Sequence, residues 1–321
     1  MIEEIFPDLF RIEIPLPDSP LKSINSYVIK SDEKNLIIDT GLNRKVCLDA
    51  MLAGLKELDV DLDKTDFFIT HSHADHSGLV PKLVRGSNST YFNKPDFENL
   101  KLWKGLDYIV EYATAQGFPE DLLRKAFEGH PGFKYSPDKI PNLTLLEEND
   151  TLNCGDYSFK CIETPGHTRG HLCLYEANNK IMVSGDHILI DITPNIQCWS
   201  DEINPLKEYI DSLEKVYEMD VDLVLPGHRR CFKNFKERID GLIEHHKQRA
   251  DEIIVLLEKE SKNSYQIASE MTWDIKVKSW DEFPPAQKWF ATGEAISHVR
   301  YLEREGKIHR KIEKDIVMFS I

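Results

Sequence analysis

The six residues His71-Ser72-His73-Ala74-Asp75-His76 constrain the fold of this chain more than any other feature. They follow residues 66–70, a short apolar run typical of a buried strand that ends where the histidines begin. Imidazole nitrogens and carboxylate oxygens are the ligands that zinc and similar divalent ions take in proteins. We therefore predict that a loop at a strand end directs four side chains toward a metal site: His71, His73, Asp75 and His76.

Further ligands are expected from later strand ends, because one hexapeptide cannot complete two coordination shells. Three candidates each follow an apolar run and stand next to a glycine. Glycine allows the tight backbone path that turns a side chain at a strand end toward an ion. These candidates are His167 after Pro165-Gly166, Asp186 after Ser184-Gly185, and His228 after Pro226-Gly227.

Strands and helices are predicted to alternate around these ligands, which is typical of an α/β fold. Apolar runs and period-two alternation predict strands at 10–14, 27–29, 36–39, 66–70, 142–146, 157–163, 171–176, 181–185 and 221–225. Helical spacing of apolar residues predicts helices at 42–57, 77–84 and 204–219. Beyond about residue 236 the spacing predicts helices near 238–260, 264–271 and 286–305, and then a hairpin of 307–309 with 316–319.

The motif His-x-His-x-Asp-His, followed by the three later ligands and preceded by Ile38-Asp39-Thr40-Gly41, resembles the metallo-β-lactamase superfamily over about residues 8–232. The resemblance implies a four-layer αβ/βα sandwich with two metal ions at one edge. It implies that His71, His73 and His167 bind one ion, that Asp75, His76 and His228 bind the second, and that Asp186 bridges both. It also implies that Asp39 supports the ligands without touching a metal, and we interpret His171 as a buried hydrogen-bonding partner of the site.

The chemistry expected of such a centre is hydrolysis. Two adjacent divalent ions lower the pKa of a bridging water, which supplies a hydroxide nucleophile, and they polarise the bond that is attacked. Asp75 is the expected catalytic residue, because it can orient the hydroxide and then pass its proton to the leaving group. Zinc is the preferred ion, and iron and manganese are alternatives that the same ligands accept.

Two segments extend beyond the implied fold. A catalytic domain is expected at 1–237, with a helical insertion at about 95–140, and a winged-helix-like domain is expected at 238–321. The insertion is interpreted as a lid that lines an apolar pocket; the alternative is a helical pair packed on the core or on the second subunit of a homodimer. Its aromatic residues are Phe97, Trp103, Tyr108, Tyr112, Phe118, Phe127, Phe133 and Tyr135.

Charge argues against an extended nucleic-acid interface. The net charge is −15, and residues 240–321 carry 13 Lys and Arg against 15 Asp and Glu, so the C-terminal segment lacks a basic footprint.

The acidic start and the lack of a long apolar run predict a cytoplasmic protein with no membrane association. Five other histidines are interpreted as surface or packing residues: His130, His245, His246, His298 and His309. His187 follows a predicted ligand and is interpreted as either structural or facing the substrate.

The leading hypothesis is therefore a dinuclear metal-dependent hydrolase of a small ester, thioester or lactone. The first alternative is a metal-dependent ribonuclease or phosphodiesterase, which the resemblance of the C-terminal segment to the winged-helix extension of some superfamily members supports. The second alternative is a catalytically silent binding protein on the same fold. That hypothesis is weakened because every metal position of the superfamily pattern is filled in this sequence.

Overall fold

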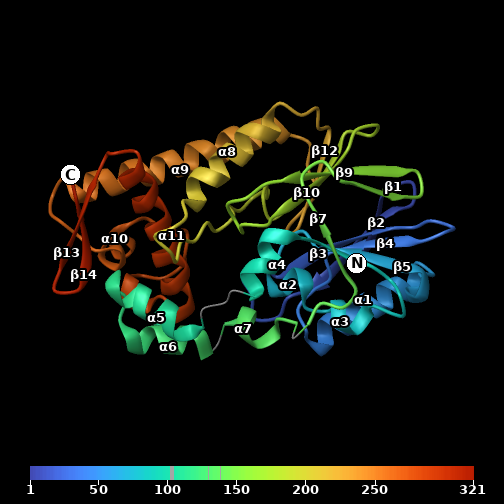
Figure 1. The fold of residues 1–321 in the computed structure, drawn as a ribbon, viewed down its shortest axis with the longest axis horizontal. Helices are drawn as coiled ribbons and strands as arrows, with labels where there is room; N and C mark the ends of the chain where they lie inside the picture. The colour runs from blue at the N-terminus through green and yellow to red at the C-terminus, as the bar shows by residue number, and fades with distance from the viewer. Residues whose placement is uncertain (102–104, 129, 138) are drawn as a thin grey trace. The chain divides into compact units, whose positions relative to one another are not determined.

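The computed structural model describes residues 1–101, 105–128, 130–137 and 139–321, which form two compact units (Figure 1). Unit 1 consists of Met1–Lys101, Pro131–Pro194 and Lys215–Arg238. Unit 2 consists of Leu102–His130, Asn195–Glu214 and Ile239–Ile321. Trp103, one of the aromatic residues of the predicted insertion, lies outside the described residues.

Unit 1 contains two mixed sheets. The first sheet is antiparallel from its first to its fourth strand and parallel from there on; its order is β1 (Ile2–Phe6), β2 (Leu9–Pro15), β3 (Ser23–Ile29), β4 (Asn35–Ile38), β5 (Thr65–Phe68), β6 (Thr90–Asn93) and β7 (Leu143–Leu146). The second sheet is antiparallel except for its first pair; its order is β12 (Leu223–Pro226), β11 (Ile181–Gly185), β10 (Leu172–Glu176), β9 (Tyr157–Glu163) and β8 (Thr151–Cys154).

Alternating side chains of the first sheet reach two different cores, because successive residues of a strand point to opposite faces. Leu36 and Ile38 of β4 lie in the core that the two sheets share, together with residues such as Leu174 of β10. Ile37 lies in the core on the other face, which Met51 and other residues of α1 (Lys45–Glu57) cover. The prediction of a layered α/β fold is thus confirmed as an αβ/βα arrangement of two mixed sheets and helices.

Short helices complete unit 1. The 3₁₀ turn η1 (Leu62–Lys64) precedes β5, and α2 (Ala74–Ser77) and α3 (Val80–Leu83) follow it. Helices α4 (Lys94–Lys101) and α7 (Pro131–Tyr135) are the parts of the predicted insertion that belong to this unit.

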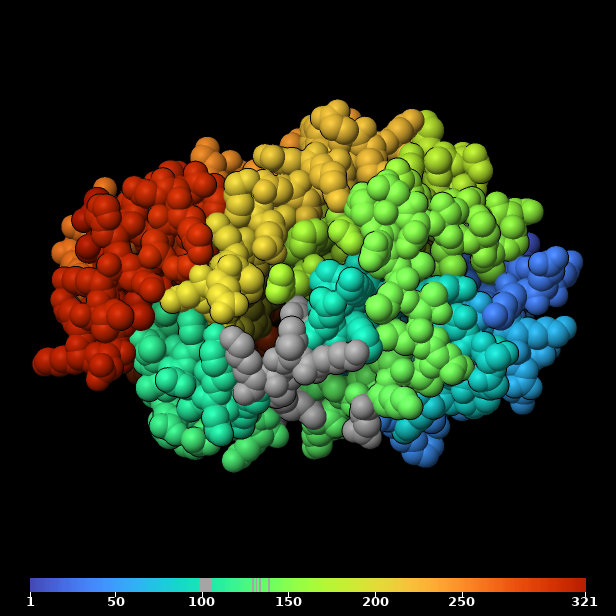
Figure 2. Space-filling model, in the orientation of Figure 1, coloured from blue at the N-terminus to red at the C-terminus, as the bar shows by residue number. Residues whose placement is uncertain are grey.

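Unit 2 is mainly helical and draws on three parts of the chain. Its elements are α5 (Leu106–Ala115), α6 (Glu120–Glu128), most of α8 (Pro205–Tyr217), most of α9 (Phe235–Leu257), α10 (Ser264–Glu270), the 3₁₀ turn η2 (Trp280–Glu282), α11 (Pro285–Arg304), β13 (His309–Glu313) and β14 (Ile316–Ser320). Figure 2 shows the residues of α5 and α6 lying directly against the C-terminal residues, which are coloured red.

Several of the aromatic residues that were interpreted as part of a lid lie in the core of unit 2. Phe118 and Phe127 are buried against Trp289 of α11, and the ring of Trp199 stacks on Trp289 with centroids 3.4 Å apart. These side chains stabilise unit 2 by removing large apolar surfaces from water. The lining of a substrate pocket by the insertion stays a prediction.

The helices predicted after residue 236 are confirmed, and so is a terminal hairpin, although its first strand is His309–Glu313 and not 307–309. A winged-helix arrangement is not evident. Residues 239–321 share their core with parts of 105–128 and 195–214, since Phe118 and Trp289 pack together. The spacing of apolar residues within one segment does not reveal which distant segments complete its core. Within the part of the chain that the structure describes, no helix has the length and apolar character needed to cross a bilayer.

Candidate metal centre

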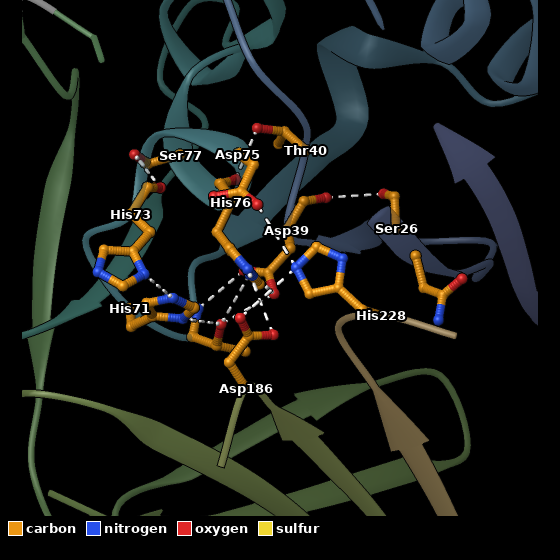
Figure 3. A network of polar contacts seen from close by, with 12 residues as sticks. Ser26, Asp39, Thr40, His71, His73, Asp75, His76, Ser77, Asp186 and His228 are labelled. Carbon is orange, nitrogen blue, oxygen red and sulfur yellow. Dashed lines mark hydrogen bonds and ion pairs between the residues drawn. The ribbon is translucent and has the colours of Figure 1, made fainter. Parts of the chain in front are cut away.

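All seven predicted ligands lie in unit 1, on segments that follow strand ends. Six of them, all except His167, are labelled in Figure 3. His71 and His73 follow β5, and Asp75 and His76 lie in α2, for which His73 is the N-cap residue. His167 lies between β9 and β10, Asp186 follows β11 directly, and His228 follows β12. The sheets thus bring together side chains that are up to 157 positions apart, from 71 to 228.

His71, His73 and His167 form the first group. Nδ1 of His73 lies 3.0 Å from Nε2 of His71 and 3.0 Å from Nε2 of His167. In a tetrahedral zinc site with zinc–nitrogen bonds of about 2.0–2.1 Å, two ligand nitrogens are separated by about 3.3 Å. The three nitrogens are therefore arranged as three corners of one coordination shell.

Asp75, His76 and His228 form the second group, and Asp186 lies between the two groups. Nε2 of His228 lies 3.4 Å from Oδ2 of Asp75 and 3.5 Å from Oδ2 of Asp186. The other oxygen of Asp186, Oδ1, lies 3.6 Å from Nε2 of His76. Because Oδ2 also lies 3.6 Å from Nε2 of His167, the Asp186 carboxylate faces both groups.

Three atoms of the second group and of Asp186 are buried without a hydrogen-bond partner: Nε2 of His76, Nε2 of His228 and Oδ1 of Asp186. A buried polar atom without a partner costs about 1–3 kcal/mol, so three in one place call for a further binding partner. Nitrogen and carboxylate oxygen together suit a divalent metal ion. The residues present therefore fit the metal centre that the sequence implies.

Asp39 fixes the ring of His76. Its Oδ2 accepts a hydrogen bond from Nδ1 of His76 at 2.7 Å and from Oγ1 of Thr70 at 2.8 Å, while its Oδ1 accepts from the backbone N–H of Thr70 at 2.9 Å. A carboxylate that holds one ring nitrogen turns the other toward the metal and makes it a stronger ligand. The structure thus places Asp39 behind His76, where the resemblance implied a supporting residue.

His228 and His171 are oriented by similar contacts. Nδ1 of His228 donates to the backbone carbonyl of Ser23 at 2.7 Å, which directs Nε2 toward Asp186. Nε2 of His171 accepts the backbone N–H of Asp186 at 3.1 Å, and its Nδ1 lies 2.8 Å from Oγ1 of Thr164. His171 therefore holds the backbone that carries Asp186.

Gly227 leaves room for the ligands. A Cβ atom at this position would lie 2.5 Å from Oδ1 of Asp186 and 2.8 Å from Cε1 of His76. Both distances are too short for non-bonded atoms, so any side chain here displaces two ligands at once. The loop that carries His228 is held in turn by Asn25, whose Nδ2 donates to the carbonyl oxygens of Pro226 and Arg229.

Asp96 was not recognised from the sequence, although it connects two ligand loops. Its Oδ2 accepts the backbone N–H of Ser72 at 2.8 Å and the hydroxyl of Thr168 at 2.8 Å, and its Oδ1 accepts the backbone N–H of Gly170 at 2.7 Å. Burial raises the pKa of Asp96, and these hydrogen bonds oppose the rise. Asp96 lies in α4, twenty residues after the histidine cluster, so no sequence spacing points to it.

Asp96→Ala is expected to weaken metal binding about 10–100-fold, the usual effect of removing an outer partner of metal ligands. The reason is that Ser72 lies between His71 and His73, and Thr168 is next to His167, so both loops lose an anchor. The metal affinity would be measured by competition with a chromophoric chelator. An affinity equal to that of Asp191→Asn, a control at a half-exposed aspartate paired with Arg230, would contradict the anchoring role.

In the metal-free protein, protonated histidines balance the negative charges of the carboxylates in the centre. Burial by itself lowers the pKa values of His76 and His228, but the neighbouring carboxylates outweigh it. Asp39 and Asp186 raise the pKa of His76 well above its ordinary value, and Asp186 and Asp75 raise the pKa of His228 to about 10. Conversely, burial raises the pKa of Asp186, but His228 and His76 outweigh it and hold this pKa well below its ordinary value.

Metal binding at pH 7 is therefore expected to release protons. A pKa of about 10 means that His228 is protonated at pH 7 in the metal-free protein, and a metal ligand must be unprotonated. The apparent metal affinity should rise with pH up to about 10. Calorimetric zinc titrations in two buffers of different ionisation enthalpy would measure the protons released, and identical heats in both buffers would contradict the expectation.

Comparison with known proteins agrees with this geometry. A family model described as "Metallo-beta-lactamase superfamily" matches residues 20–228, which include every ligand named above. Over 98% of both chains, the protein is 23% identical to the Bacillus subtilis protein called "Probable metallo-hydrolase YqjP".

Two further relatives are named as thioesterases. The human "Acyl-coenzyme A thioesterase MBLAC2" is 24% identical over 65% of this chain and 74% of its own length. The "Atrochrysone carboxyl ACP thioesterase" of Emericella nidulans is 22% identical over 82% of this chain and 69% of its own length.

Solved structures show the same fold along almost the whole chain. The metallo-beta-lactamase family protein TTHA1429 from Thermus thermophilus has a TM-score of 0.82 at 22% identity and covers 99% of both chains. A beta-lactamase domain protein from Burkholderia ambifaria has a TM-score of 0.86 at 23% identity and covers 99% of this chain and 94% of its own.

Proposed function

The chain belongs to the metallo-β-lactamase superfamily and is a metal-dependent hydrolase, and from this premise we propose that it cleaves small acyl thioesters at a dinuclear centre. One observation carries the proposal of two metal ions. The carboxylate of Asp186 faces both ligand groups, and its Oδ1 is buried without a hydrogen-bond partner. One ion would be held by His71, His73 and His167. The other would be held by Asp75, His76 and His228, and Asp186 would bind both ions.

The charge of the ligands supports two ions better than one. Asp75 and Asp186 both have pKa values below the ordinary range: burial raises each, and the contact with His228 outweighs it. Two ionised carboxylates beside five imidazoles suit two divalent cations. With a single ion in the first group, Asp75 and His228 would have no metal to bind.

Two divalent cations bound there, zinc by preference, would supply a hydroxide nucleophile at neutral pH and polarise the scissile carbonyl. Asp75 is ionised, and its side chain is 18% exposed, whereas those of His228, His167 and Asp186 are 0%, 7% and 9% exposed. His73, in the first group, is exposed as well. From its position the Asp75 carboxylate can accept the proton of the attacking water and pass it to the leaving thiolate. Asp39 and His171 keep His76 and Asp186 in position during this transfer.

The thioester is favoured over the ester and the lactone by the two relatives named as thioesterases, of acyl-coenzyme A and of an acyl carrier protein. Hydrolysis breaks the carbon–sulfur bond and yields a carboxylate and a thiol. The net charge of −15 is unfavourable for a long phosphate backbone, which supports a small substrate over a nucleic acid.

The test is a comparison of substrates with the zinc-loaded protein. Acyl-coenzyme A thioesters of short, medium and long chain would be assayed by release of free thiol, and p-nitrophenyl esters, a lactone and single-stranded RNA would be tested in parallel. The expected result is a higher kcat/KM for at least one thioester than for the esters and the lactone. Cleavage of RNA with no thioester hydrolysis would replace the proposal with the nuclease alternative, and metal binding without any turnover would favour a silent binding protein.

A further inference from the structure

A second group of ligand-type side chains lies in unit 2. One ligand atom from each of His245, His246 and Glu294 lies within 4.8 Å of the others. His245 and His246 belong to α9 and Glu294 belongs to α11, so the group joins two helices that are about 50 positions apart in sequence. His246 is 1% exposed and Glu294 is 8% exposed.

The hydrogen bonds around His246 determine which of its nitrogens is available. Nδ1 of His298 lies 2.8 Å from the backbone carbonyl of Glu294, which can only accept, so this nitrogen carries the proton. His298 is 0% exposed, which disfavours a charged ring, so its Nε2 is an acceptor. Nδ1 of His246 lies 3.2 Å from that Nε2 and therefore donates to it.

Nε2 of His246 is left as an unprotonated nitrogen with no hydrogen-bond partner among the described residues. The ring of His246 is almost completely buried as well, which favours its neutral form. A ring that donates through one nitrogen to a fixed acceptor and presents the lone pair of the other is arranged as metal-binding histidines are. A buried lone pair of this kind calls for a cation or a hydrogen-bond donor.

Glu294 and Arg249 are consistent with a cation at this place. Asn195 donates to Oε2 of Glu294 at 2.8 Å and thereby fixes the carboxylate. Arg249 is close enough for its charge to act on Glu294, but its guanidinium pairs with Glu252 at 2.7 Å and lies over the ring of Trp273 at 4.3 Å. The carboxylate of Glu294 can therefore still bind a metal ion.

We infer that His245, His246 and Glu294 bind one divalent transition-metal ion of the zinc class. Two imidazoles and one carboxylate are a ligand set that zinc uses when a further coordination position stays open to water or to a small ligand. Such an ion would connect α9 with α11 and so stabilise unit 2. This site is additional to the proposed hydrolytic centre and shares no residue with it.

The metal content of the full chain tests the site. Wild type, Glu294→Gln and His245→Gln would be loaded with zinc, dialysed against metal-free buffer and analysed for zinc per chain. We expect each variant to hold one zinc fewer than wild type, whereas His309→Gln, which alters an exposed histidine of β13, should match wild type. Zinc contents equal to wild type in both variants would overturn the inference.

Two further measurements keep the test decisive if a variant folds poorly. Diffraction from wild-type crystals at the zinc absorption edge should give an anomalous peak between the three side chains, and a water molecule in place of that peak would refute the site. The zinc-dependent rise in melting temperature should be smaller for Glu294→Gln than for His309→Gln. Equal rises in the two variants would count against a metal that connects α9 and α11.

Discussion

Replacing Asp186 with asparagine is expected to remove hydrolysis almost completely, by at least about 10³-fold in kcat/KM. Asparagine keeps the shape of the side chain but loses the negative charge that faces His76, His167 and His228 at 3.5–3.6 Å. Since removal of an outer partner already costs about 10–100-fold, loss of the carboxylate that faces both ligand groups should cost more. Zinc content should fall in the same preparation.

Asp191→Asn is the matched control for this substitution. It makes the same chemical change five residues later, at a half-exposed side chain that pairs with Arg230 at 3.2 Å. Its zinc content and kcat/KM should equal those of wild type. If Asp186→Asn retained both the zinc and the activity of this control, Asp186 would have no role as a shared ligand.

Replacing Asp75 with asparagine is expected to lower kcat by about 10²–10⁴-fold, the range that a positioned general base contributes. The asparagine amide cannot accept the proton of the attacking water. Burial raises the pKa of Asp75, but the close contact with His228 and the charge of His76 outweigh it, so the carboxylate is ionised throughout the neutral range. Steady-state rates would be measured with the best thioester.

Because Asp75 is also a proposed ligand, the rate must be normalised to the zinc bound in each preparation. A variant that binds as much zinc as wild type but turns over slowly would assign the loss to proton transfer. A variant that loses zinc would assign part of the effect to coordination. Full zinc content together with a wild-type kcat would show that the proton passes through another group.

The sequence was informative wherever one local segment decides the structure. The run at 36–39 and the run at 66–70 correspond to the buried strands β4 and β5, and the ligands of the centre follow strand ends as the glycine-flanked motifs indicated. Three strands were not predicted. β1 lies at the edge of its sheet and is half exposed. β6 (TYFN) and β8 (TLNC) have two apolar residues each and so form no apolar run like those at 36–39 and 66–70.

What the sequence did not reveal depends on contacts between distant residues. Asp96 acts through Ser72 and Thr168, which lie 24 and 72 positions away, and His228 is oriented by the backbone carbonyl of Ser23, which has no sequence signature. Phe118 and Phe127, which were interpreted as part of a lid, are buried against Trp289. His246 and His298 were interpreted as surface or packing residues, and both are indeed packed inside unit 2. The sequence did not reveal that they form a pair whose proton positions follow from the Glu294 carbonyl.

The spread of the ligands from position 71 to position 228 has a consequence for the newly made chain. A ribosome that adds about 5–20 residues per second needs about 8–30 s to make the intervening 157 residues, and during that time the first four ligands have emerged without their partners. Metal captured by the hexapeptide in this interval would be held by an incomplete shell and would exchange readily. Stable metal retention should therefore begin only after β12 has joined its sheet, so that acquisition of tightly bound zinc marks the end of synthesis and folding of unit 1.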